Sequence, residues 1–163
     1  MKQSFLFAFK GALSCIKMER NFRIHLAVTF YVLMASIVTR LSETEWVLVL
    51  ICIGAVTGAE IFNTTIEKLC DTLHPAWNKG IGMVKDMTAG AVLMFAITSA
   101  AVGGIIFFSN EKLTRMVAFA KDHIVMSVLI AISLPVAVCS VFRRYRDDNK
   151  ISHDNDSRTS ERR

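Results

Sequence analysis

Long stretches of this chain carry no charged side chain, and that feature limits most strongly how the chain can fold. Residues 87–110 are uncharged over 24 positions, and residues 124–142 are uncharged over 19. Residues 46–59 also lack charge, and residues 24–39 contain only His25 as a titratable group. A helix needs about 20 apolar residues to cross the hydrocarbon core of a bilayer, with about 17 as the lower limit. The runs therefore predict membrane-spanning helices.

We expect four spans. The run from residue 46 is long enough if it continues through Glu60 to about Ile66, and the first run is long enough if it includes Phe22 and Leu41. The hydrophobic fraction of 53% and the mean hydropathy of +0.43 are high for a soluble domain. The predicted fold class is all-α, a polytopic membrane bundle with an N-terminal amphipathic surface helix, three core transmembrane helices and a fourth.

Three regions follow from this pattern. Residues 1–110 form the expected membrane core, which includes the surface helix over residues 1–20. That helix groups large apolar side chains on one arc and lysines on the next, as in helices that lie on an anionic leaflet; an ordinary cytosolic cap is the alternative. Residues 111–142 are the expected linker and additional span. Residues 143–163 are polar and charged, so we expect a disordered cytoplasmic tail.

Basic residues set the expected orientation, because they accumulate on the cytoplasmic side of membrane proteins. Lysine and arginine are abundant before the first span, in the second loop and after the fourth span. Four spans therefore place both termini and the second loop in the cytoplasm, although the basic third loop fits this rule poorly. The four cysteines show no CxxC spacing, so we expect neither disulfides nor structural zinc. We expect no nucleic-acid partner.

A polar stripe interrupts the second span, in the segment GAEIFNTTIEKLCD at residues 58–71. A helix turns about 100° per residue, so Glu60, Glu67 and Asp71 fall within about 40° of one another, with Asn63 beside them. A carboxylate at membrane depth is costly and indicates a functional site. Three acids on one face suggest a cation site.

Each residue of the stripe also has a structural interpretation. Glu67 and Asp71 could form a solvated helix end, and Asn63 could bond between helices. Glu60 could be a buried acid paired with a basic residue of another helix. Against this, Glu60 lies about 21 Å of helix beyond Trp46, just short of the far side of a core about 30 Å thick. A deep carboxylate could meet a lipid hydroxyl there, while Glu67, about 10 Å further on, could hold a hydrated cation.

The stripe and two further motifs resemble the bacterial diacylglycerol kinase and undecaprenol kinase family of small membrane lipid kinases. The other motifs are FAFKGALSCIKMERNFRIHL at residues 7–26 and VKDMTAGAVL at residues 84–93. The resemblance covers about residues 4–108. It implies a homotrimer in the bacterial inner membrane, with the site facing the cytoplasm, that uses ATP and Mg²⁺ to phosphorylate the hydroxyl of a lipid alcohol.

The resemblance also implies roles for individual residues. Glu60 would be the general base, and Glu19 and Glu67 would bind the Mg²⁺ that accompanies ATP. The expected ATP-binding residues are Phe7, Glu19, Glu67, Ala76, Trp77, Asn78, Lys85 and Asp86. The expected substrate-binding residues are Asn21, Phe22, Arg23, Glu60 and Ala89, and the expected supporting residues are Asn63 and Asp71.

The chain departs from the family pattern in two places. Trp77-Asn78 stands where the family often has Tyr-His, and the fourth span and the tail exceed the minimal architecture. The sequence around Arg23 looks like the branch that favours undecaprenol, with diacylglycerol as the alternative lipid. A non-enzymatic proton or cation carrier that uses the acidic stripe is the alternative function, but it leaves Lys85-Asp86 unexplained.

Overall fold

The structure is a computed structural model that describes residues 2–74, 78–133 and 135. The described residues form helices and contain no strand. The chain divides into two compact units, Met1–Asp122 and His123–Arg163. The helices of the first unit are α1 (Lys2–Met18), α2 (Arg20–Thr39), α3 (Glu43–Leu73), α4 (Lys79–Phe107) and α5 (Asn110–Asp122). In the second unit, Ile124–Ser133 is helical.

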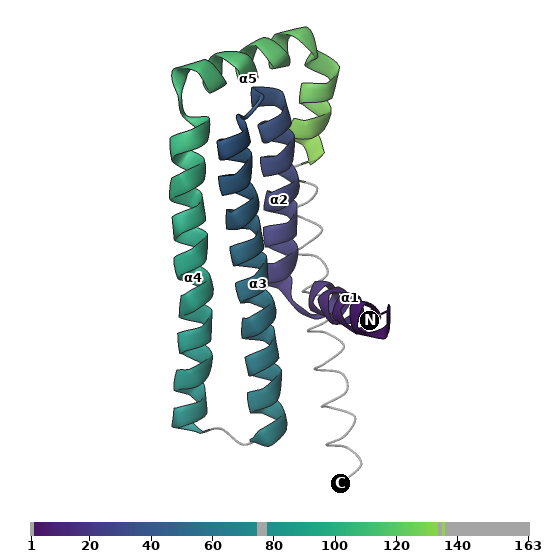
Figure 1. The fold of residues 1–163 in the computed structure, drawn as a ribbon, viewed down its shortest axis with the longest axis vertical. Coiled ribbons are helices and arrows are strands. Elements are labelled where there is room, and N and C mark those ends of the chain that lie inside the picture. The colour runs from purple at the N-terminus through teal and green to yellow at the C-terminus, as the bar shows by residue number, and fades with distance from the viewer. Residues whose placement is uncertain (1, 75–77, 134, 136–163) are drawn as a thin grey trace. The chain divides into compact units, whose positions relative to one another are not determined.

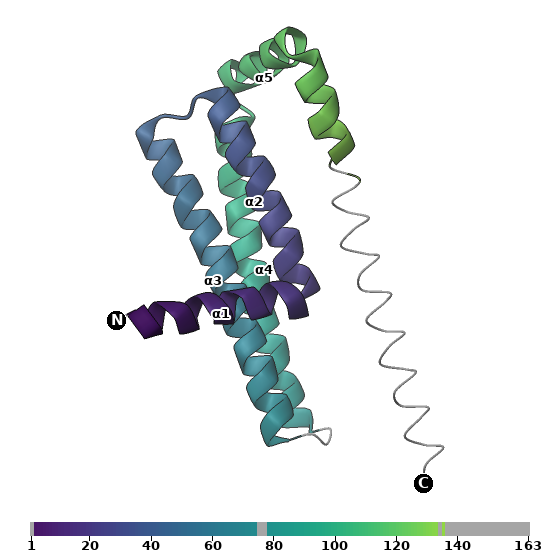
Figure 2. The ribbon, with the colours of Figure 1, turned by 90° about the vertical axis from the view of Figure 1, so that its right-hand side faces the viewer.

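Helices α2, α3 and α4 lie side by side, and α5 crosses one end of this group (Figure 1). Helix α1 lies crosswise to the three (Figure 2), near the start of α2. Among the described residues, three helices are long and apolar enough to span a membrane, namely Arg20–Thr39, Glu43–Leu73 and Lys79–Phe107. A fourth span is possible if α5 and Ile124–Ser133 are counted together. The predicted all-α membrane bundle with a surface helix is therefore confirmed.

The turn between α2 and α3 is defined by its capping residues. Arg40 adopts the left-handed conformation, with φ 52°, and its N–H bonds to carbonyls of the last turn of α2. Ser42 then begins α3 with a capping box, in which its side chain accepts from the N–H of Glu45 while the Glu45 carboxylate accepts from the N–H of Ser42. These bonds satisfy backbone groups that helix ends leave unpaired. The turn is short, so α2 and α3 run antiparallel.

Helix lengths decide where the polar stripe lies. Helix α2 has 20 residues, which corresponds to about 30 Å and matches one hydrocarbon core. Helices α3 and α4 have 31 and 29 residues, so each is about 14–16 Å longer than that core. Leu41 lies in the turn between α2 and α3. Phe22 before it and Glu60 after it are separated from Leu41 by equal numbers of residues. Glu60 therefore lies level with the start of α2, and the rest of α3 extends beyond.

Most of the apolar surface faces outward. In the most hydrophobic windows of α2, α3 and α4, only 17%, 22% and 11% of the residues are buried inside the chain. A small core forms near the α2–α3 turn around Leu41, Val49 and Ile106. The exposed apolar surface requires lipid or another protein copy to cover it, as expected of a membrane protein.

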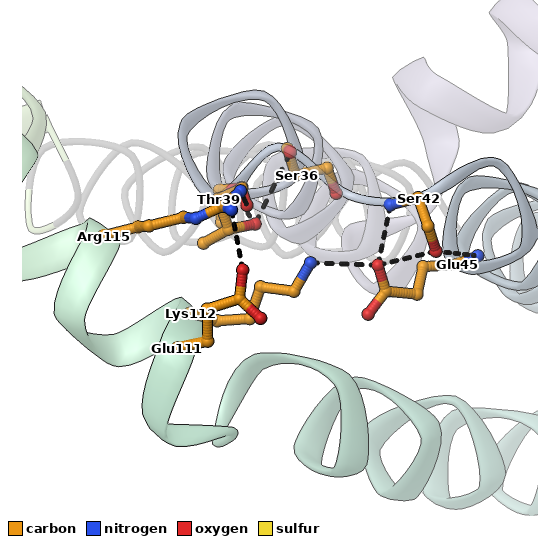
Figure 3. A network of polar contacts seen from close by, with 8 residues as sticks. Ser36, Thr39, Ser42, Glu45, Glu111, Lys112 and Arg115 are labelled. Carbon is orange, nitrogen blue, oxygen red and sulfur yellow. Dashed lines mark hydrogen bonds and ion pairs between the residues drawn. The ribbon is translucent and has the colours of Figure 1, made fainter.

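Helix α5 begins the region that was predicted to contain a linker and an additional span. Lys112 is buried and donates to the carboxylate of Glu45 at 2.9 Å, and Arg115 donates to the carbonyl of Thr39 at 3.0 Å. These bonds tie α5 to both sides of the α2–α3 turn (Figure 3). The limits proposed at residues 110 and 142 stay predictions. The predicted tail, residues 143–163, and most of the second half of the predicted fourth span lie outside the described residues.

Candidate active site

The centre of the candidate site is Glu60, whose side chain is only 3% exposed. His25 of α2 lies against it, with 3.2 Å between His25 Nε2 and Glu60 Oε1. The structure thus shows the pairing considered for Glu60 as an alternative, a buried acid beside a basic residue of another helix. No role for His25 was predicted from the sequence. An ionisable residue in an apolar span was the signal that could have singled it out.

Two further carboxylates approach Glu60. The charges of Glu19 and Glu67 both act on it electrostatically. Glu67 follows on the same helix by about two turns, whereas Glu19 stands at the break between α1 and α2, in an extended conformation as the N-cap of α2. The predicted catalytic residue and the two predicted metal ligands therefore come together from two segments of the chain, helix α3 and the break between α1 and α2.

Helix α1 packs against this part of α3 through Cys15. The buried Cys15 thiol hydrogen-bonds to Thr64, which lies one turn after Glu60. Burial raises the pKa of the Cys15 thiol, its bond to Thr64 acts in the opposite direction, and the charges of Glu19 and Glu60 raise it further. The crosswise position of α1 thus brings Glu19 to the level of Glu60.

Asn63 connects the stripe and offers an unsatisfied oxygen. Its Nδ2 donates to Glu67 Oε1 at 2.8 Å. Its Oδ1 is buried and has no hydrogen-bond partner among the residues that the structure describes. Buried polar atoms are usually paired, so an orphaned acceptor beside carboxylates suits a ligand that brings its own donors, such as a hydrated cation.

The donor set fits magnesium bound with a nucleotide better than a metal bound by protein alone. In the described part of the chain, no three His, Cys, Asp or Glu side chains are close enough to hold a metal ion together. Mg²⁺ commonly uses one or two carboxylates and completes its shell with water and substrate phosphates. The two predicted ligands, Glu19 and Glu67, match that requirement in number and in type of oxygen.

A second polar pair lies where α3 and α4 extend beyond α2. Lys85 of α4 forms a short ion pair with Asp71 of α3. The side chains are 33% and 60% exposed, so the pair is accessible from water. Lys85 also experiences the charge of Glu67. The structure therefore unites the two motifs that the sequence places at residues 58–71 and 84–93.

The other predicted site residues differ in burial and in whether they have a hydrogen-bond partner. Phe22 is buried and Arg23 has two guanidinium nitrogens, Nε and Nη1, that are buried without a partner among the described residues. Asn78 caps α4, its Oδ1 accepting from the N–H groups of Gly80 and Ile81. Asn78 is exposed, as are Phe7, Asn21, Asp86 and Ala89. Ala76 and Trp77 lie outside the described residues.

An apolar groove of about 300 Å³ runs between α2, α3 and α4. His25 and Val56 line one end, and Val32 and Phe107 line the other. On α4 the lining extends from Ala96 to Phe107, a rise of about 16 Å. Its length and apolar lining suit a hydrocarbon chain. Because His25 contacts Glu60, the groove ends at the buried carboxylate.

Comparison with known proteins agrees with this geometry. The family model for prokaryotic diacylglycerol kinase matches residues 6–107, which is well over half of the chain. The chain belongs to the prokaryotic diacylglycerol kinase family. It is therefore a lipid kinase, and α5 and all that follows lie beyond the matched region of this kinase family.

Two curated relatives are similar to this family member. An undecaprenol kinase of Bacillus subtilis is 34% identical over 105 residues, which cover 64% of this chain and 85% of the relative. A diacylglycerol kinase of Synechocystis is 31% identical over 102 residues, which cover 62% of this chain and 58% of that relative. No solved structure matches the chain.

The Lys85–Asp71 pair yields a charge-exchange prediction. Lys85→Gln and Asp71→Asn should each raise the KM for ATP, because Lys85 would lose either its charge or the carboxylate that orients it. An exposed ion pair contributes little to stability, so the melting temperature should change little. The double variant Asp71→Lys, Lys85→Asp restores the pair but reverses its direction. Steady-state kinetics should show that this exchange leaves the KM high, whereas recovery of wild-type KM would mean that the pair only joins the helices.

Proposed function

We propose that this protein transfers the γ-phosphoryl group of ATP to the hydroxyl of a membrane lipid alcohol, with Mg²⁺, at the cytoplasmic face of a bacterial inner membrane. The observation that carries the proposal is the buried Glu60, which stands between an apolar groove and a water-accessible polar end. Family membership supports the kinase chemistry. It does not favour the alternative of a cation carrier, which offers no role for Lys85.

Glu60 is the general base in this proposal. As the lipid oxygen bonds to the γ-phosphorus, its proton passes to the Glu60 carboxylate and the bond to the bridging β,γ-oxygen breaks. The products are a lipid phosphate and ADP. A positioned base of this kind contributes about 10²–10⁴-fold to a rate. Phosphoryl transfer otherwise depends on positioning and charge stabilisation.

Glu19 and Glu67 hold Mg²⁺ together with the nucleotide phosphates. When bound, the metal neutralises negative charge on the phosphates during transfer. Asn63 holds Glu67 in place through the Nδ2 bond. Lys85 carries the positive charge best placed for phosphate, because its Asp71 partner keeps it at the exposed end of the site. Phe7, Asp86 and the segment at residues 76–78 complete the proposed nucleotide contacts.

The apolar groove supports a lipid substrate. One hydrocarbon chain lying in it would bring the attached hydroxyl to the level of Glu60. Asn21, Phe22, Arg23 and Ala89 border the lipid in this proposal. The relative from Bacillus subtilis is named for undecaprenol, so we propose undecaprenol as the preferred substrate, with diacylglycerol as the second candidate.

The remaining apolar surface supports assembly. The outward faces of α2, α3 and α4 are large enough to contact both lipid and further copies, and we propose a homotrimer. The proposed orientation places the connection between α3 and α4 in the cytoplasm, where ATP is available. Residues 1–110 would contain every residue given a role above.

Replacing Glu60 with Gln tests the base directly. The substitution keeps the size of the side chain and removes its ability to take a proton, so kcat should fall by about 10²–10⁴-fold. ATP binding, measured by equilibrium binding to the purified protein, should stay near the wild-type value. Glu43→Gln, which changes an exposed acid at the other end of α3, is the matched control. A Glu60→Gln variant with kcat within a few-fold of wild type would exclude Glu60 as the base.

The metal ligands give a prediction of a different kind. Glu19→Gln and Glu67→Gln each remove one hard oxygen ligand, so each should raise the Mg²⁺ concentration needed for half-maximal activity. Added Mg²⁺ should partly restore both variants. The same titration on Glu43→Gln should match wild type. Unchanged magnesium dependence in both Glu19→Gln and Glu67→Gln would remove them from the metal site.

A further inference from the structure

His25 is a residue of the site to which the proposed chemistry gives no role. It lies in a span whose other residues carry no charge between Ile24 and Thr39. Its side chain is 23% exposed and touches two different features. The imidazole Nε2 is 3.2 Å from Glu60 Oε1, and the same ring lines the end of the apolar groove.

Glu60 needs a partner of this kind. A carboxylate buried beside the charges of Glu19 and Glu67 is destabilised by burial and by repulsion. The structure shows His25 in contact with the Glu60 carboxylate. At 3.2 Å an imidazole N–H that points at the carboxylate can donate to one of its oxygens. Such a bond would limit rotation of the carboxylate and leave the other oxygen for a substrate hydroxyl.

The location of His25 also links the base to the lipid. A hydroxyl that enters from the groove must pass the ring that holds the base. Proximity and orientation dominate such reactions, so a base free to rotate would be less effective.

We propose that His25 is a positioning residue for the lipid kinase reaction, holding the Glu60 carboxylate at the mouth of the groove in the orientation that meets the lipid hydroxyl. The inference rests on the proposed function, because it assumes that Glu60 is the base. His25 takes no proton from the substrate. It acts through Glu60, and its contribution appears in kcat rather than in ATP binding.

Three substitutions test whether hydrogen-bond donation to Glu60, and not another property of His25, supports the reaction. His25→Leu removes the donor and keeps apolar bulk, His25→Gln places an amide N–H at a reach similar to Nε2, and His25→Asn places one that is too short. We expect kcat to fall about 10–100-fold in the Leu and Asn variants, as is typical when the partner that orients a site ligand is lost. The Gln variant should stay within a few-fold of wild type. The KM for ATP should not change in any of them. Phe30→Leu, an exposed position on α2 outside the groove, is the control.

A double-mutant cycle with Glu60→Gln completes the test, using the full chain in lipid nanodiscs. If His25 acts through Glu60, His25→Asn should have little further effect once Glu60 is Gln. Equal losses in the Gln and Asn variants would overturn the proposal, because the imidazole itself would then be the required group. Wild-type kcat in the Asn variant, or a full additional loss in the double variant, would overturn it too. An inactive wild-type protein would instead refute the proposed function.

Discussion

The fold places a carboxylate where water is scarce, and the rest of the site depends on how that group is stabilised. Glu60 is almost fully buried, although ionised groups strongly favour water. Three elements act on it: His25 from α2, Glu67 from its own helix and Glu19 from the α1–α2 break. An acid that lies close to two further acids indicates that a cation belongs to the working site. His25 places an imidazole beside Glu60, and the proposed Mg²⁺ would supply the cation.

Because the three long helices differ in length, the site has an apolar side and a water-accessible side. Helix α2 matches the hydrocarbon thickness, whereas α3 and α4 are longer. The additional turns carry Glu67, Asp71 and Lys85 beyond the start of α2. The groove on one side of Glu60 is apolar and the ion pair on the other side is exposed. In the proposed function, a lipid and a nucleotide would therefore reach one carboxylate from opposite directions.

Much of this arrangement was predictable from the sequence, because membrane spans and helical faces follow simple periodicities. The uncharged runs predicted the helices, and the spacing of Glu60, Glu67 and Asp71 predicted a shared face. Contacts between helices were harder to predict, since they depend on how far each helix is shifted along its axis and rotated about it. The His25–Glu60 pair joins residues of two helices that the α2–α3 turn makes antiparallel. The bonds of Lys112 and Arg115 to either side of that turn likewise join residues far apart in the sequence.

The central claim is that ATP and a membrane lipid alcohol meet at Glu60. The most direct measurement incubates the purified full chain in vesicles with γ-labelled ATP and Mg²⁺, using undecaprenol, diacylglycerol or neither as the added lipid. The account predicts label in the extracted lipid phosphate, more with undecaprenol than with diacylglycerol, and none when Mg²⁺ is chelated. Transfer to neither alcohol by a protein that has inserted and assembled would contradict it.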